Sequence, residues 1–290
     1  MSTDRPAGMD AIADRYAELW HTMRYDGDRL RDPSQTTLFL DRVRAALDRQ
    51  SAMLDTGADA QVVANSFTVE AVAYESDRTQ ILKLRHRDLG TYHALKTSTH
   101  AHDAIAAGLL LREAQLMSAM RHPNIVSAEV VLRLSDGRPA LVMEWLGGSV
   151  ADTLNDGPPI PDELLDGLAR DMLSGLAAIH DAGMVHADIS PRNLLLTVGG
   201  MPTLKIADFG IALTRGETHV SLGLASAGSP GFSMPAVDAD AAGDLHACGE
   251  VLALMLARVA TPQPRLTEIS ATLRNVPAGV TARAILDAIA

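Results

Sequence analysis

The sequence has little cysteine and no long apolar run. Cys248 is the only cysteine among 290 residues, which excludes an internal disulfide bond and is typical of a reducing compartment. The longest strongly apolar run, Val251–Ala257, is far too short to span a bilayer. The first ten residues contain neither a basic n-region nor an apolar h-region, so we expect no secretory signal peptide. A cytoplasmic location is expected, and export by a route that needs no cleaved signal stays open.

Charge of one sign is not concentrated in any block of the chain. The formal net charge of −11 comes from 25 basic and 36 acidic residues. An acidic chain without a basic stretch is poorly suited to phosphate backbones, so neither nucleic acid nor an anionic membrane is expected as a partner. Apolar residues make up 47% of the chain, which predicts a folded protein of one large or two modest domains.

Lysine is scarce compared with arginine. Only Lys83, Lys96 and Lys205 are lysines among the 25 basic residues. Where a chain favours arginine so strongly, each retained lysine is a candidate for a special role. The alanine- and arginine-rich composition is typical of a bacterial source.

The most informative stretch is HADISPRN, His186–Asn193, which is followed 15 residues later by Asp208-Phe209-Gly210. The two motifs resemble the catalytic loop H-R-D-x-x-x-x-N and the D-F-G metal loop of the protein kinase family. The resemblance implies that Asp188 is the base that orients the attacking hydroxyl. It also implies that Asn193 and Asp208 hold Mg²⁺ or Mn²⁺, because phosphoryl transfer from ATP needs oxygen ligands for the metal.

The region before these motifs has the pattern of strands followed by a helix. Strands are expected at Phe67–Ala73, Ile81–Arg87 and Tyr92–Thr97, and a helix at Ala101–Met120. The third strand carries Lys96, and the helix carries Glu113 nine residues before the run HPNIV. The kinase resemblance implies that Lys96 grips the α- and β-phosphates and that Glu113 pairs with its ammonium.

The turn between the first two strands contains no glycine, although kinases carry G-x-G-x-x-G there. At the glycine positions this chain has Tyr74, Ser76 and Thr79. Glycine lets the backbone approach the phosphates closely. We therefore expect the hydroxyls of Ser76 and Thr79 and the guanidinium of Arg78 to make the contacts, against repulsion from Glu75 and Asp77. Weak ATP binding or a loss of transfer stays open.

The segment LVMEWLGGS resembles the strand and hinge that join the two kinase lobes. The resemblance implies that Met143 is the gatekeeper beside the adenine. The backbones of Glu144 and Leu146 would hydrogen-bond the purine edge. Ser149 and Leu195 would complete the nucleotide site.

Within the catalytic loop, two positions depart from the kinase pattern. Ala187 replaces the arginine that commonly pairs with a phosphorylated activation loop, so such phosphorylation is not expected to be the switch. Ser190 replaces the lysine of Ser/Thr kinases. Arg192, where tyrosine kinases often carry arginine, would supply the missing charge as a planar fork suited to phosphate. The later segment GSPGFSMPA, with Ser229, resembles the end of Ser/Thr kinase activation segments and favours Ser/Thr specificity.

The last part of the chain resembles a shortened C-lobe. Asp244, in the run DLHACG, would hold the backbone of the catalytic loop, and Cys248 would be a small buried residue. From Gly249 only 290 − 249 = 41 residues remain, and a full C-lobe would need roughly twice that. Ala236 replaces a glutamate that kinases pair with an arginine near the domain end, and that arginine is missing as well.

The resemblance implies an α+β, two-lobed kinase-like fold. Its expected parts are a helical extension at 1–60, an N-lobe and hinge at 61–146, and a mostly helical, reduced C-lobe at 147–290. The extension rests on an apolar helical face from Met9 to Met23 and on a second helix after Ser34. It would pack on the kinase lobes or act as a docking or inhibitory module.

The function implied is transfer of the γ-phosphate of Mg-ATP to Ser or Thr of a protein substrate, with autophosphorylation included. A small-molecule phosphotransferase is one alternative, which Ala187 favours. A nucleotide-binding protein or scaffold without transfer is another, which the missing glycines favour. The helical extension and the short C-lobe also allow a bacterial effector or toxin kinase, or a kinase completed by a partner that binds residues 1–60 or the C-lobe.

Overall fold

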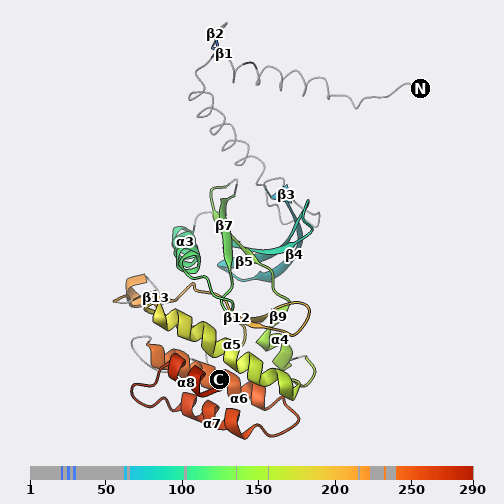
Figure 1. Cartoon of the computed structure of the whole chain (residues 1–290). Helices are drawn as coiled ribbons and strands as arrows, with labels where there is room; N and C mark the ends of the chain where they lie inside the picture. Colours follow the sequence, from blue (N-terminus) through green and yellow to red (C-terminus); the bar gives the residue numbers. More distant parts are fainter. Residues whose placement is uncertain are drawn as a thin grey trace, which may run out of the picture.

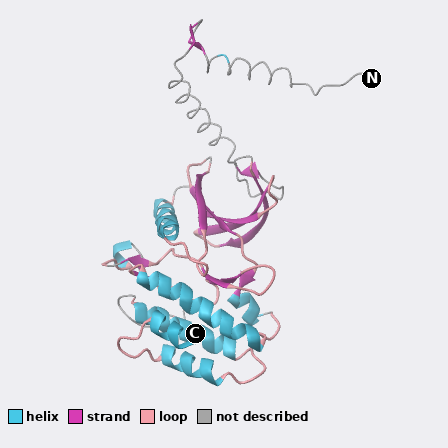
Figure 2. Cartoon of the chain, in the orientation of Figure 1, coloured by secondary structure: helices cyan, strands magenta, loops and turns pink. Residues whose placement is uncertain are grey.

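The computed structural model describes residues 21, 25–26, 29–30, 62–63, 66–100, 103–134, 136–155, 157–214, 216–222, 232 and 240–289. Figure 1 shows a curved sheet with one helix beside it, above a second lobe built mainly of helices. Figure 2 shows the same division by secondary structure. The predicted two-lobed α+β fold is confirmed.

The N-lobe sheet has six antiparallel strands in the order β3-β4-β5-β6-β8-β7. They are β3 (Val62–Val63), β4 (Phe67–Glu75), β5 (Thr79–His86), β6 (Tyr92–Ser98), β7 (Ala128–Arg133) and β8 (Pro139–Glu144). Directly opposite residues share a face of the sheet. The register Tyr74–Ile81–Lys96–Leu141 therefore sets Tyr74 on the same face as Lys96.

Strands β4 and β5 extend further towards their turn than the sequence predicted. The sequence indicated a turn over Tyr74–Gln80, but Glu75 pairs with Gln80 and only residues 76–78 lie between the strands. The side-chain amide of Gln80 also donates to Glu75 Oε2 at 3.1 Å. The ends of these strands are polar, so a search for alternating apolar residues does not recognise them as strand.

Helix α3 (Ala104–Ala119) packs beside this sheet and presents Leu110, Glu113 and Met117 to the interior. It begins after Asp103, whose carboxylate accepts the N–H of Ala106 at 2.9 Å, so the sequence prediction placed its start three residues too early.

The C-lobe is organised around helix α5 (Asp162–Asp181), the longest helix in the described part of the chain. Its buried apolar residues recur at helical spacing: Leu165, Leu168, Met172, Leu176 and Ile179. The other C-lobe helices are α4 (Val150–Asn155), η1 (Val220–Leu222), α6 (Ala241–Leu256), α7 (Pro264–Arg274) and α8 (Ala282–Ile289). Gly249 lets α6 approach α7, because a Cβ there would lie 2.7 Å from the backbone N of Arg274.

Short strands between the lobes position the loops of the central motifs. They are β9 (Gly148–Ser149), β10 (Met184–Val185), β11 (Leu194–Leu196), β12 (Leu204–Ile206) and β13 (Leu213–Thr214). Strand β10 pairs with β13, and β11 lies between β12 and β9. The catalytic loop starts directly after β10, and Asp208-Phe209-Gly210 lies between β12 and β13.

Most of the helical extension expected at 1–60 lies outside the described residues. Within it the structure describes helical backbone at His21 and a short antiparallel pair, β1 (Tyr25–Asp26) with β2 (Arg29–Leu30). Among the described helices, none has the length and apolar character that a membrane crossing requires.

Candidate active site

Lys96 is the centre of a charged network between the lobes. Its Nζ donates to Glu113 Oε1 at 2.8 Å and to Asp208 Oδ1 at 2.8 Å. Lys96 and Glu113 are buried, at 8% and 2% exposure, whereas the Asp208 side chain is 46% exposed. Burial lowers the pKa of Lys96, but Asp208 and Glu113 raise it by more, so the pKa lies above its ordinary value and the ammonium stays charged.

The two carboxylates around Lys96 differ in their environments. Burial raises the pKa of Glu113 above its ordinary value, although the Lys96 ammonium opposes the shift. For Asp208, burial raises the pKa, but the charge of Lys96 and the N–H of Gly210 lower it by more, so the pKa lies below its ordinary value. Asp208 is therefore an ionised carboxylate that is half open to the cleft.

Asp208 also has strained backbone geometry. Its φ of +66° lies in the left-handed region, which is uncommon for a residue with a Cβ. The next residue, Phe209, is fully buried, and its ring meets the edge of the His186 ring with centroids 4.9 Å apart. Packing of Phe209 therefore holds Asp208 in a conformation that isolated aspartate would rarely adopt.

The catalytic loop is anchored from below by Asp244, as the sequence predicted. This carboxylate is 2% exposed and accepts the backbone N–H groups of His186 and Ala187, each at 2.8 Å. It also lies 2.9 Å from His180 Nε2. Ala187 has a φ of +65°, so the loop makes a left-handed turn at a residue with a side chain. The two hydrogen bonds to Asp244 stabilise that turn.

Asn193 and Asp188 are held together inside the loop. The Asn193 side-chain amide donates to the backbone oxygen and to Oδ2 of Asp188, both at 2.8 Å. These bonds use its nitrogen, so its oxygen points elsewhere. The N–H of Ala207 donates to the backbone oxygen of Asn193 at 2.8 Å, which brings Asn193 beside the residue that precedes Asp208.

The donor set around Asp208 suits a hard cation. Mg²⁺ prefers carboxylate, amide and phosphate oxygens and keeps several waters, so one carboxylate and one amide oxygen match its needs. Asp208 and Asn193 supply this pair. Within the described ranges no three His, Cys, Asp or Glu side chains gather as a metal site, so a metal there would depend on the nucleotide for further ligands.

The glycine-free turn is closed by its own hydroxyl. Ser76 Oγ accepts the N–H groups of Arg78 at 3.4 Å and Thr79 at 3.1 Å. The turn is also fixed from the side, because Thr99 Oγ1 donates to Ser76 O at 2.8 Å and Thr99 N donates to Arg78 O at 3.1 Å. The Ser76 hydroxyl is therefore occupied by the turn itself, which leaves Arg78 and Thr79 as the turn's candidates for contacting phosphate.

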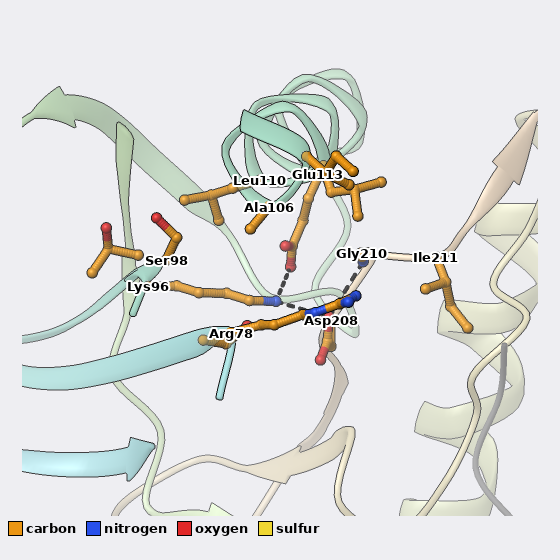
Figure 3. A pocket seen from close by; sticks show the side chains of 13 residues that line it. Arg78, Lys96, Ser98, Ala106, Leu110, Glu113, Asp208, Gly210 and Ile211 are labelled. Atoms are coloured by element: carbon orange, nitrogen blue, oxygen red, sulfur yellow. Dashed lines mark hydrogen bonds and ion pairs between the residues drawn. The ribbon is translucent and has the colours of Figure 1, made fainter. Parts of the chain in front are cut away.

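A cavity of about 190 Å³ lies between this turn, α3 and the Asp208 loop. Arg78, Lys96, Glu113 and Asp208 are among its lining residues. In Figure 3 the Arg78 side chain extends towards the side of the cavity where Asp208 and Gly210 lie, and Lys96 enters from β6. The cavity thus combines two cationic groups with the half-exposed carboxylate.

The residues that the resemblance assigned to the hinge lie at the end of β8 and in the short strands that follow it. Met143 is buried at the end of β8, and Leu195 in β11 is paired with Ser149 in β9. The Glu144 carboxylate accepts from Lys205 Nζ at 2.8 and 3.0 Å and from Ser127 N at 2.7 Å. The Glu144 side chain is thus engaged by Ser127 and Lys205.

Two residues that the sequence assigned to phosphate, Ser76 and Arg192, are not among the lining residues of the cavity between the turn, α3 and the Asp208 loop. Arg192 is exposed and does not line it. Ser190, at the lysine position of Ser/Thr kinases, is 2% exposed, and its hydroxyl has no partner among the described residues. The activation-segment residues Ser229 and Ala236 lie outside the described residues.

Sequence reasoning missed three contacts between basic and acidic side chains around the site. Lys205 binds Glu144, Asp244 binds His180, and Arg112 on α3 binds Glu217. The scarcity of lysine in the sequence could have indicated the pair of Lys205 with Glu144. All three lysines have carboxylate partners, since Lys83 lies 3.5 Å from Glu70 and 4.1 Å from the ring centre of Tyr92.

Comparison with known proteins gives consistent matches. A family model described as the protein kinase domain matches residues 77–275, more than half of the chain. Testis-specific serine/threonine-protein kinase 3 of Homo sapiens is 33% identical over 153 residues, which cover 51% of this chain and 56% of that protein. Mitogen-activated protein kinase kinase 9 of Arabidopsis thaliana is 32% identical over 133 residues, 46% of this chain and 42% of that protein.

A bacterial relative matches as well. Probable serine/threonine-protein kinase PknB of Lactococcus lactis subsp. lactis (strain IL1403) is 29% identical over 160 residues, which cover 53% of this chain and 25% of that protein. The chain spans about half or less of the length of these curated relatives.

Proposed function

This chain belongs to the protein kinase family, and we propose that it transfers the γ-phosphate of Mg-ATP to serine or threonine of a protein substrate. The observation that carries the proposal is the network in which Lys96 joins Glu113 and Asp208, both at 2.8 Å. It supports the proposal because phosphoryl transfer in kinases requires the strand lysine to be paired with the helix glutamate.

The residues have distinct roles in this proposal. Lys96 would bind the α- and β-phosphates, and Glu113 would hold the ammonium in place. Asp188 would orient the substrate hydroxyl and accept its proton, while its hydrogen bond from Asn193 fixes the carboxylate. Bound Mg²⁺ would neutralise phosphate charge, held by Asp208 and the Asn193 oxygen.

Arg78 would take over part of the work of the missing glycines. A glycine-rich loop contacts phosphate through backbone N–H groups, but here the N–H groups of Arg78 and Thr79 are donated to Ser76. The guanidinium of Arg78 lines the same cavity as Lys96 and offers a charged fork for phosphate. Adenine would lie between the hinge backbone, at Glu144 and Leu146, and Leu195.

The finer parts of the proposal concern substrate and setting. Serine or threonine is preferred because two of the three relatives above are named as serine/threonine-protein kinases. Autophosphorylation, a cytoplasmic location and a regulatory partner that binds residues 1–60 are included in the proposal. A second candidate is nucleotide binding without transfer, which is favoured by the turn that has Glu75 and Asp77 but no glycine.

The test is an assay with γ-labelled ATP and Mg²⁺ that follows label in protein and in small molecules separately. Lys96→Met should abolish protein labelling. Lys83→Met is the matched control, because Lys83 is also a sheet lysine with a carboxylate partner but lies outside the network, and it should retain labelling. Label in a small molecule would support a small-molecule phosphotransferase. Tight ATP binding without label would support the second candidate.

A further inference from the structure

The residue before Glu113 on α3 forms a second bridge between the lobes. Arg112 Nη2 donates to Glu217 Oε2, and the same oxygen accepts the N–H of Thr214 at 2.7 Å. The side chains of Arg112 and Glu217 are 17% and 31% exposed. Burial raises the pKa of Glu217, but the hydrogen bonds from Thr214 and the Arg112 guanidinium lower it by more, so the carboxylate is ionised at neutral pH.

The position of Glu217 connects this bridge to the catalytic loop. Thr214 lies in β13, which pairs with β10, and β10 ends directly before His186. Glu217 also donates its own backbone N–H to Thr214 O at 3.0 Å, so its turn is fixed on β13. Figure 1 shows α3 above β13. The pair therefore ties the helix that carries Glu113 to the strand pair beneath the catalytic loop.

Among the described residues, Glu217 supplies the one carboxylate that pairs with the guanidinium of Arg112. Its Nη1 is buried and has no hydrogen-bond partner among the described residues. Removal of Glu217 would leave a largely buried cation without an anion, which is unfavourable in the geometry seen here. Helix α3 would then be held less firmly against the C-lobe, and the distance between Glu113 and Lys96 would no longer be fixed.

We propose that Glu217 is a positioning residue: its permanent carboxylate holds α3 through Arg112 and makes a phosphate group on the activation segment unnecessary. The inference rests on the proposed kinase function. Ala187 agrees with it, since the catalytic loop offers no arginine at that position to receive a phosphate. The active arrangement is then encoded in the chain and needs no prior modification.

The first test compares Glu217→Gln with wild type, both made free of phosphate by phosphatase treatment and checked by mass spectrometry. Glutamine keeps the size of the side chain and an acceptor for Thr214, but it removes the charge. We expect kcat/KM to fall about ten-fold, which corresponds to the loss of one charge-assisted hydrogen bond between the lobes. Glu268→Gln is the matched control, because Glu268 is exposed on α7, and its kcat/KM should be unchanged.

A charge reversal separates positioning from simple folding. Arg112→Glu and Glu217→Arg should each lower kcat/KM, and the double variant should recover part of that loss. Recovery should be incomplete, because an arginine at position 217 cannot accept the N–H of Thr214. Thermal unfolding of each variant checks that the protein folds. Where the single variants unfold at the wild-type temperature, recovery of kcat/KM in the double variant reports the contact between the two side chains and not a change in stability.

The outcomes distinguish this inference from the proposed function. No transfer by wild type under any condition would refute the kinase function. If wild type transfers phosphate, then loss of its activity on dephosphorylation would overturn the role of Glu217. Full activity of Glu217→Gln, or a folded double variant as inactive as the single variants, would overturn it as well.

Discussion

Replacement of Lys96 by methionine should destabilise the protein in a strongly pH-dependent way. Glu113 is 2% exposed, and Lys96 is its charged partner at 2.8 Å. Breaking a buried pair by removing one partner costs about 3 kcal/mol or more, because the other charge stays buried. For a domain of this size, that corresponds to a fall in the midpoint of thermal unfolding of roughly 6–12 °C.

The pH dependence follows from protonation of Glu113 in the variant. Burial already raises the pKa of Glu113, and the loss of the ammonium raises it further above the value of the unfolded chain. Below the unfolded pKa, about 4.3, both states carry the proton and the penalty is absent. As the pH rises through the folded pKa, the folded state must bury the charge, and its stability falls.

The assay is thermal unfolding at pH 5 and pH 8 without nucleotide, for wild type, Lys96→Met and Lys96→Met/Glu113→Gln. The deficit of the single variant should be larger at pH 8. The double variant should recover about half of it there, because glutamine carries no charge to bury. Equal deficits at both pH values, or no recovery in the double variant, would refute the reasoning.

Three further changes probe separate parts of the site. Asp244→Asn should lower kcat about ten-fold or more and destabilise the fold by about 2 kcal/mol, since one of the buried backbone N–H groups would lose a carboxylate acceptor. Turnover assays would measure kcat, and chemical unfolding would measure the stability. Arg78→Ala should raise the KM for ATP about ten-fold with little change in unfolding temperature, whereas the exposed Arg85→Ala on the same hairpin should change neither. Lys205→Met should lower the unfolding free energy by about 1 kcal/mol, because Glu144 is only partly buried, and prior substitution of Glu144 by glutamine should remove most of that effect in a double-mutant cycle.

The sequence predicted those parts of the site that depend on residue type and spacing. Asn193 contacts Asp188 and lies beside the residue that precedes Asp208, because the chain turns back through the paired strands β11 and β12. Lys96 and Glu113 were assigned by their places in a strand and a helix. The structure brings them to hydrogen-bonding distance.

The rest depended on tertiary contacts that no local pattern encodes. The left-handed turn at Ala187 could not be predicted from the sequence, because the position is not a glycine. Asp244, which is 57 residues away in the chain, stabilises this turn by accepting the N–H of Ala187. The contact between Arg112 and Glu217 joins residues 105 apart in the chain. Arg192 was assigned to phosphate from its place in the motif, but its side chain is exposed, since the direction of a side chain in a loop is set by packing.

The central claim is tested most directly by phosphoamino acid analysis of protein labelled with γ-phosphate from Mg-ATP, for wild type beside Asp188→Asn. The account predicts label on serine or threonine in the wild type and none in the variant, because Asp188 is the one carboxylate proposed to orient the hydroxyl. Equal labelling of the two proteins, or a wild type that binds Mg-ATP and labels no protein, would contradict it.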